Sequence, residues 1–403
     1  MDTQLTNPTK ILKSTPTKTR IESIDLLRGA VIVIMALDHV RDYFHAAHFL
    51  FDPTNIAQTS PALFFTRWIT HYCAPAFMFL AGTSAFFVGE RKSKAQLTKF
   101  LFTRGLWLML LEITVVNFAW FFNPDFPFFR LSVIWALGAS MIALSLLIYL
   151  PKKLLLALGL IILFGHNLLD NIHVAGNGFK AFLWAELHEQ KQFDFYGHTI
   201  RTGYPLLPWI GIMVLGYCFG SLYKREVLPA RRKRFCLLIG AGAIILFIVL
   251  RATNVYGDPH RWSDFPTITR SVMSFFNVTK YPPSMLYTLM TLGPCLIFLA
   301  LAEKPLNKFT TAITRIGRVP MFFYILHIYL IHALAVIAVE ISGRNWTQMI
   351  LFGNDNPHLK GYGFSLWVVY VVWVLVIIAL YPLCKWYDRY KTAHKEKWWL
   401  SYL

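Results

Sequence analysis

The chain has 403 residues, of which 56% are hydrophobic and 16% aromatic, and it carries a formal net charge of +18. A chain with this composition is typical of a membrane protein with several spans. Because its basic residues stand in short clusters between apolar segments, the charge follows the positive-inside pattern and argues against a nucleic-acid partner.

Apolar segments of spanning length follow one another along the whole chain. They lie near residues 22–48, 64–89, 98–122, 131–150, 153–169, 205–223, 234–252, 283–302, 315–341 and 364–386. We therefore predict an all-α fold, a polytopic membrane helical bundle of about ten transmembrane helices. Because no repeat or linker divides the chain, residues 21–390 are predicted to form a single transmembrane domain.

The connections between these segments alternate in charge. Lysine and arginine gather in every second connection and in both flanking tails. The positive-inside rule therefore places both termini on the cytosolic side. Residues 1–20 are polar and basic and lack the apolar core of a signal peptide, so we expect a mobile cytosolic tail. Residues 391–403, which end in aromatic and basic side chains, are predicted to form a cytosolic or interfacial tail.

The first segment, IESIDLLRGAVIVIMALDHVRDYFHAAH, carries ionisable residues at both ends of an apolar middle. Charged groups at membrane depth are costly and usually face a bundle interior or a wet cavity. At ~100° per residue, the eleven steps from Arg28 to His39 return to within ~20° of the same helix face, ~16 Å along the axis. Asp42 shares that face and is able to orient the imidazole, so the segment predicts a reaction site. Its other candidate residues are Asp25, Asp38 and His48.

Two later segments carry further candidates. Arg67 and His71 are four residues apart and share a face of the second predicted helix, before Pro75, which suits a kinked helix. His71 either takes part in the site or hydrogen-bonds within the bundle. In the ninth segment, His327 and His332 are five residues apart, face different directions and make a poor metal pair. His327 is the better candidate to complete the polar centre, although a structural hydrogen bond explains it nearly as well.

The sequence contains no recognisable metal or phosphate motif. Its five cysteines are scattered in or beside apolar segments, so neither a disulfide framework nor a metal site follows from them. There is no Gly-rich phosphate loop, no paired metal-binding motif and no nucleophile elbow. We therefore predict no bound metal.

Several blocks together resemble the transmembrane acyltransferase superfamily. They are Arg28-x10-His39 within RIESIDLLRG…MALDHVRDYFH, then THYCAPAFMFLAGTS, FYILHIYLIH and WWLSYL. They are most similar to a bacterial branch grouped with the heparan-alpha-glucosaminide N-acetyltransferase catalytic domain. The similarity is densest over residues 20–90 and recurs at 204–219, 281–296 and 317–335.

The resemblance implies acyl transfer across a bilayer, here the bacterial cytoplasmic (inner) membrane, by a multi-pass protein. The donor would be cytosolic acetyl-CoA or another acyl-CoA, used as co-substrate. The acceptor would be an amine or hydroxyl group, usually on a sugar or glycan, at the far side. Arg28 and His39 are matched positions, but the active histidine of the lysosomal enzyme aligns better with His45 or His48. We favour His39 because of its neighbours, and His48 stays the alternative.

A mechanism follows from these matches. Arg28 would hold the phosphate or pantetheine portion of the donor, and His39, oriented by Asp42 or Asp38, would take the proton of the attacking acceptor. His71 or Arg67 would stabilise the oxyanion, and a covalent acetyl-histidine intermediate is an alternative.

Two other interpretations are open at this point. In a transporter or permease, the same intramembrane groups would relay protons or bind substrate, although no inverted repeat or pair of broken helices supports this. An inactive relative that acts as a membrane scaffold is the other. Besides lipid, acyl-CoA and acceptor, a homodimer is the one further partner that the sequence leaves open.

Overall fold

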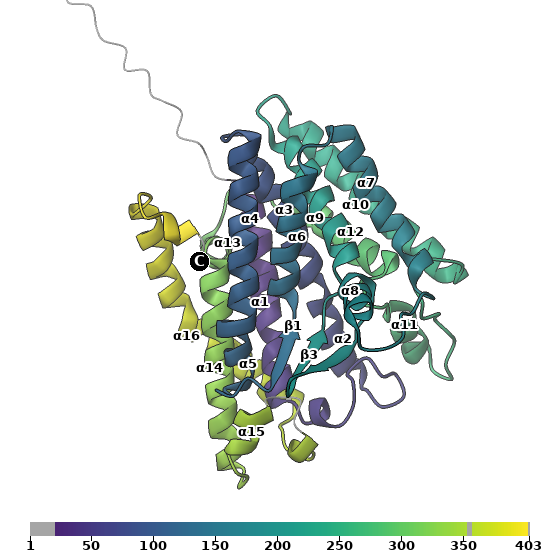
Figure 1. Ribbon diagram of the computed structural model, residues 1–403, viewed down its shortest axis with the longest axis vertical. Helices are drawn as coiled ribbons and strands as arrows, with labels where there is room; N and C mark the ends of the chain where they lie inside the picture. The colour runs from purple at the N-terminus through teal and green to yellow at the C-terminus, as the bar shows by residue number, and fades with distance from the viewer. Residues whose placement is uncertain (1–20, 353–356, 402–403) are drawn as a thin grey trace, which may run out of the picture.

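A computed structural model of the protein describes residues 21–352 and 357–401. Over these ranges the chain forms a bundle of long helices that run roughly along one direction (Figure 1). The tail expected to be mobile, residues 1–20, lies outside the described residues, as do residues 402–403 of the second predicted tail.

Helices account for most of the described chain. They are α1 (Glu22–Phe44), α2 (Pro61–Ile69), α3 (Cys73–Gly89), α4 (Lys94–Leu111), α5 (Asn117–Phe121), α6 (Val133–Leu147), α7 (Lys152–Gly165), α8 (Phe179–His188), α9 (Leu206–Phe219), α10 (Pro229–Thr253), α11 (Ile268–Phe276), α12 (Met285–Leu301), α13 (Lys308–Arg318), α14 (Pro320–Ile341), α15 (Thr347–Phe352) and α16 (Leu366–Ala393). The prediction of a polytopic helical bundle agrees with this content.

Seven helical stretches of the described chain are long and apolar enough to cross a membrane. They are Pro61–Gly89, Lys94–Phe121, Lys152–Leu169, Leu206–Tyr223, Pro229–Thr253, Pro320–Ile341 and Leu366–Ala393. Helices α6 and α12 are apolar but shorter. Helix α1 has 23 residues and is not among the seven, because its charged side chains interrupt the apolar composition. The prediction of about ten spans and of cytosolic termini stays a prediction.

The predicted helix at residues 315–341 is two helices in the structure. Helix α13 ends at Arg318, and α14 begins at Pro320. Between them Val319 has a φ of −129° and a ψ of 53°, outside the helical region. Proline disfavours the helical conformation in the residue that precedes it, which explains the break.

The all-α prediction missed a small sheet at the end of the bundle opposite the start of α1 (Figure 1). Its strands, in the order β1-β3-β2, are β1 (Phe128–Leu131), β2 (Gln192–Phe195) and β3 (His198–Thr202). Strand β3 pairs in parallel with β1 and antiparallel with β2. Tyr196 and Gly197 both have positive φ, at 48° and 84°, as a two-residue type I′ hairpin turn requires. These strands lie in connections that sequence periodicity left without structure, because each has only four or five residues.

Helix α1 packs against α3, α13, α14 and α16 and thus lies inside the bundle. Its contact with α13 is very close. A Cβ atom at Gly29 would lie 2.0 Å from the backbone oxygen of Ile313, and one at Gly317 would lie 2.0 Å from the backbone oxygen of Asp25. Only glycine at both positions lets the two helices approach to this distance.

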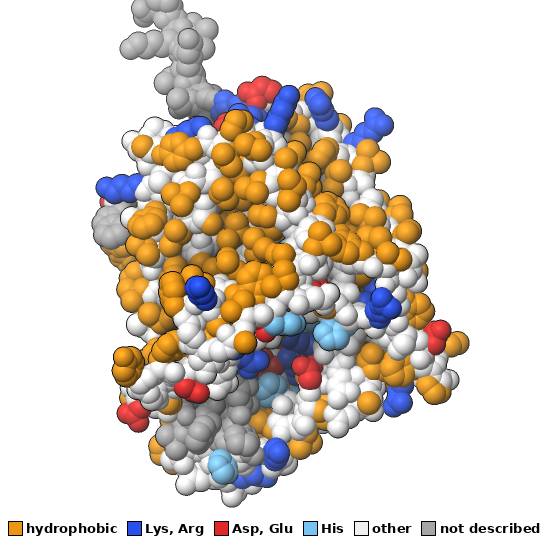
Figure 2. All heavy atoms as spheres, turned by 45° about the vertical axis from the view of Figure 1, so that its right-hand side comes forward, with side chains coloured by type: hydrophobic (Ala, Val, Ile, Leu, Met, Phe, Trp, Pro, Cys, Tyr) orange, Lys and Arg blue, Asp and Glu red, His pale blue; other side chains and the backbone are white. Residues whose placement is uncertain are grey.

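The surface is divided along the bundle. Figure 2 shows lysine and arginine side chains gathered at one end and a broad hydrophobic band across the middle. Toward the other end the surface is hollowed, and histidine, acidic and basic side chains meet there. An apolar band between two polar ends is the arrangement expected of a protein that spans a bilayer.

Candidate functional site

The amino-terminal part of α1 carries a cation held by three helices. Arg28 donates hydrogen bonds to the Asp25 carboxylate at 2.9 Å, to the Ser84 hydroxyl of α3 at 3.0 Å and to the Gly317 carbonyl oxygen of α13 at 3.3 Å. The bond to Gly317 depends on the close α1–α13 contact. Arg28 keeps 15% of its side chain exposed, so this positioned guanidinium still meets solvent.

A cleft of about 1480 Å³, which we call the basic cleft, opens at this end of the bundle. It lies between the start of α1, the end of α3 and the loops that lead into α10 and α13. Two of its cations pair with glutamates, Arg232 with Glu303 at 2.5 Å and Lys224 with Glu90 at 3.1 Å. The basic side chains that line it are Arg28, Arg91, Lys224, Arg225, Arg232, Lys304 and Arg318.

A second cavity of about 310 Å³, the apolar pocket, adjoins the basic cleft. Arg28, Ser84 and Arg318 line both cavities. On α1 the pocket is lined by Arg28, Ile32 and Met35, which follow one helix face that leads to His39. Arg28 and His39 were predicted to share one face of the helix, and the apolar pocket lies along that face of α1.

Helix α14 supplies the facing wall of the apolar pocket. Pro320, Met321 and Tyr324 line it, and His327 is the next residue on that face. The rings of Tyr324 and His39 meet edge to face with centroids 6.2 Å apart. The lining of the pocket thus leads along both helices from Arg28 toward His39.

His39 and His327 form a hydrogen-bonded pair at this point. His39 Nδ1 lies 2.7 Å from His327 Nε2, and the rings stack with centroids 4.9 Å apart. His327 Nδ1 lies 3.0 Å from the Phe323 carbonyl oxygen, which only accepts, so Nδ1 of His327 carries the proton. In neutral His327 the Nε2 atom is then the acceptor, and Nδ1 of His39 donates to it. This leaves the lone pair of His39 on Nε2.

The two aspartates that flank His39 in α1 pair with arginines. Asp38 forms ion pairs with Arg67 at 2.5 Å and with Arg41 at 2.8 Å, and Asp42 forms a close ion pair with Arg41. The partner predicted for His39 was Asp42 or Asp38. In the structure its hydrogen bond goes to His327 instead, because α14 packs against α1 at this level.

His48, the alternative catalytic histidine, lies in the short helix η1 (Ala46–Phe49), which follows α1. Its Nδ1 atom is 3.5 Å from the Asp42 carboxylate. The imidazole of His45 accepts a hydrogen bond from the Ala47 backbone N–H at 3.1 Å and so caps η1. His48 therefore has a carboxylate partner but lies outside the helix face that the apolar pocket occupies.

His71 and His332 hold helices together. The His71 carbonyl oxygen accepts a hydrogen bond of 2.7 Å from Tyr287 of α12, and Nδ1 of its buried ring has no partner among the described residues. The His332 ring lies 2.7 Å from the Ala119 oxygen and 3.2 Å from the Met349 oxygen. His332 is thus a structural histidine, whereas His71 keeps an unpaired ring nitrogen.

Several residues around the pair escaped sequence reasoning. Trp120 contacts His39 edge to face with centroids 4.9 Å apart, and Tyr324 contacts the same ring and lines the apolar pocket. Arg41, one of the ionisable residues of the first segment, is buried and pairs with Asp38 and Asp42, but no role was predicted for it. The aromatic residues carried no distinguishing sequence signal, since the chain has 34 phenylalanines, 18 tyrosines and 13 tryptophans.

A comparison with family models identifies the chain. A model described as heparan-alpha-glucosaminide N-acetyltransferase, catalytic, matches residues 20–254. The chain belongs to this family. Membership confirms the resemblance predicted from the sequence blocks and indicates a membrane acetyltransferase. A search of curated proteins found no significant match.

The heparan-alpha-glucosaminide N-acetyltransferase match covers α1 to the end of α10. It includes the first-helix candidates and Arg67 and His71, but not Tyr324 or His327. The partner of His39 and the facing wall of the pocket therefore come from the part of the chain beyond the matched range.

Proposed function

We propose that the protein transfers an acetyl or short acyl group from cytosolic acyl-CoA to an amine or hydroxyl of a sugar or glycan on the far side of the membrane. The observation that carries this proposal is that the two cavities adjoin and share the lining residues Arg28, Ser84 and Arg318. Arg28 lines both, and the apolar pocket leads from Arg28 along α1 and α14 toward the His39–His327 pair. The name of the family, heparan-alpha-glucosaminide N-acetyltransferase, supports an acetyl donor and an amino-sugar acceptor.

The basic cleft is the proposed site for the nucleotide of the donor. Phosphate groups are bound by arginine and lysine side chains, and the cleft presents several of them around one opening. Basic loops mark the cytosolic side of a membrane protein, so the cleft faces the cytosol in this proposal. The pantetheine arm would pass Arg28 and enter the apolar pocket.

His39 is the proposed general base. Its Nε2 lone pair takes the proton as the acceptor oxygen or nitrogen attacks the thioester carbonyl. The carbon–sulfur bond then breaks, and the proton passes from the imidazolium of His39 to the leaving CoA sulfur. His327 accepts the hydrogen bond from His39 Nδ1, so it keeps the base in the required tautomer and orientation.

In this proposal, His71 or Arg67 stabilises the oxyanion that forms when the acceptor attacks the thioester. Arg67 is already in a 2.5 Å ion pair with Asp38, whereas His71 Nδ1 has no partner in the described chain. An N–H at that position is the better donor for a developing oxyanion, since it gives up no existing contact.

In the direct test, protein purified in detergent is incubated with acetyl-CoA and glucosamine. Free CoA thiol and acetylated glucosamine are then measured. The proposal expects both to form together. The exposed His173→Ala variant serves as a control with an unaltered site. Substrate flux in proteoliposomes without consumption of acetyl-CoA would instead support the transporter alternative.

A further inference from the structure

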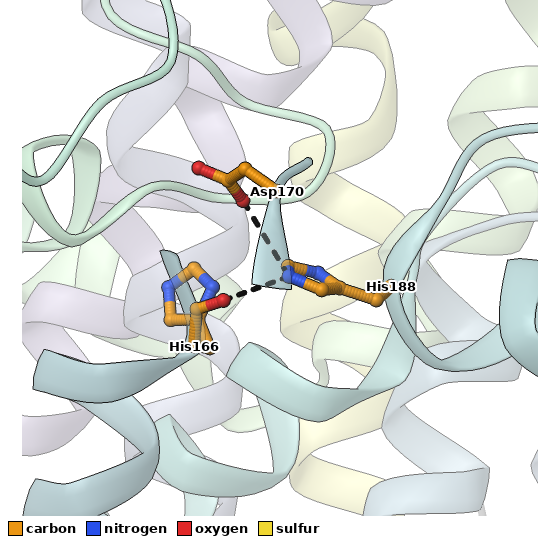
Figure 3. A group of neighbouring side chains, drawn as sticks. All are labelled: His166, Asp170 and His188. Carbon is orange, nitrogen blue, oxygen red and sulfur yellow. Dashed lines mark hydrogen bonds and ion pairs between the residues drawn. The ribbon is translucent and has the colours of Figure 1, made fainter. Parts of the chain in front are cut away.

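Two histidines and an aspartate meet at the end of α7, away from the residues proposed for acyl transfer. His166 begins the short helix η4 (His166–Leu169), Asp170 follows it, and His188 ends α8. One ligand atom from each lies within 4.8 Å of the other two. Figure 3 shows a ring nitrogen of His188 facing both the Asp170 carboxylate and the carbonyl oxygen of His166. The distances from His188 Nε2 are 3.4 Å and 2.8 Å.

The imidazoles of this cluster are buried and incompletely paired. His166 is 2% exposed and His188 is 4% exposed. Among the described residues, neither ring nitrogen of His166 has a hydrogen-bond partner, and neither has Nδ1 of His188. A buried polar atom without a partner is unfavourable by a few kcal/mol, on the order of 1–3 each. Hydrogen bonding within the protein therefore does not account for His166 in this position.

The Asp170 carboxylate is oriented by a residue that is not one of the three in the cluster. Asn167 donates a hydrogen bond of 2.8 Å to Oδ2 of Asp170 and accepts one of 2.9 Å from the Met285 backbone N–H at the start of α12. This leaves Oδ1 of Asp170 facing His188. Metal-ligating carboxylates are commonly oriented by such an outer hydrogen bond.

We propose that His166, Asp170 and His188 bind one divalent transition-metal ion of the zinc class. Two imidazole nitrogens and a carboxylate oxygen are typical zinc ligands, and three protein ligands leave a fourth position for water or for the His166 carbonyl oxygen. On binding, the proton of neutral His188 moves from Nε2 to Nδ1, and the Nε2 lone pair of the still neutral imidazole binds the metal. The ion joins the end of α7 to α8 and, through Asn167, to α12.

This proposal departs from the prediction, made from the sequence, that the protein binds no metal. His166 and Asp170 are four residues apart, but His188 is the last residue of α8, beyond the intervening loop, so no motif spacing links the three. The proposal is independent of acyl transfer, and its test needs no activity measurement.

The experiment uses the full chain in detergent, stripped with EDTA, incubated with zinc and desalted. Bound zinc is measured by inductively coupled plasma mass spectrometry, and thermal unfolding is followed with and without zinc. We expect about one zinc ion per chain and a higher Tm with zinc. The double variant His166→Ala/His188→Ala is expected to retain no zinc and to show no zinc-dependent shift in Tm. His173→Ala, which changes an exposed histidine in the same outer segment, is expected to behave as the unaltered chain.

Equal zinc retention by the unaltered chain and the double variant would overturn the proposal. If the double variant does not fold, cobalt bound to the unaltered chain decides the question. An intense visible absorption band, as four-coordinate cobalt gives, supports the site. Its absence under saturating cobalt contradicts the site.

Discussion

His39 and His327 lie 2.7 Å apart through Nδ1 and Nε2, and the Phe323 carbonyl at 3.0 Å decides which of the two donates. This relationship fixes the tautomer of His39 without a carboxylate. Because the acceptor is the neutral imidazole of His327, His39 is less polarised than it would be beside an aspartate. It also avoids placing a further negative charge beside Trp120 and Tyr324 in the bundle interior.

Replacing His327 with asparagine removes the Nε2 atom that accepts the His39 hydrogen bond, and the shorter amide has no atom at that position. We expect kcat to fall about 10²-fold, because general-base catalysis contributes about 10²–10⁴ in rate and His327 acts on it through orientation. KM for acetyl-CoA should change little, since His327 does not line the pocket. Steady-state kinetics separates the two, and the pH profile of kcat should also move. A variant with unchanged kcat and an unchanged pH profile would make His327 structural only.

Replacing Arg28 with glutamine tests donor binding. A hydrogen bond to a charged group contributes about 1.5–3 kcal/mol, so KM for acetyl-CoA should rise roughly 10- to 100-fold. Arg315→Gln is the matched control, because Arg315 lies on the neighbouring α13, bonds Tyr381 at 3.2 Å and lines neither cavity. Equal effects of the two variants on KM would contradict a specific role for Arg28.

Gly29→Ala tests the close contact between α1 and α13. The added Cβ would lie 2.0 Å from the Ile313 backbone oxygen, so the helices must separate. We expect a loss of about 1–3 kcal/mol in stability, as overpacking usually costs, and weaker placement of Arg28. Gly242→Ala in α10 is the control, because nothing lies within 4 Å of its added Cβ. Thermal unfolding of both variants in detergent checks this, and an equal Tm for the two would count against the contact.

Glu186 on α8, outside the predicted spans, makes stability depend on pH. Burial raises its pKa to about 7 from an ordinary value of 4.5, although a hydrogen bond from the Trp135 indole opposes the shift. The folded state therefore holds this proton more tightly than the unfolded chain, and stability is lost as pH rises from 4.5 toward 7.

Glu186→Gln should consequently raise Tm at about pH 8, where the buried carboxylate is charged, and change it little at about pH 5. Thermal unfolding of both proteins at the two pH values gives the comparison. A gain of the same size at both would show that charge is not the cause.

The part of the site that depends on one helix was predictable from sequence. The eleven-residue spacing of Arg28 and His39 determines their common face, because the helical period is fixed, and the cavity lies along that face. The partner of His39 was not predictable, because it depends on how α14 packs on α1. His327 itself was a candidate, but the charged neighbours of His39 in sequence favoured Asp42, which pairs with Arg41.

The fold was predictable to a similar extent. Apolar segments long enough to span a bilayer gave the helices, since their composition is a local property. The break at Val319 follows from Pro320 but was hidden within a continuous apolar segment. The cluster of His166, Asp170 and His188 depends on α8 folding back beside η4, and no local pattern records that contact.

The choice between the two histidines of the first segment tests the account most directly. His39→Ala and His48→Ala are purified in detergent, compared by size-exclusion elution and Tm, and assayed for release of CoA from acetyl-CoA with glucosamine. We expect a folded, inactive His39→Ala protein and an active His48→Ala protein. An active His39→Ala protein beside an inactive, folded His48→Ala protein would contradict it and assign the base to the His48–Asp42 pair, 3.5 Å apart.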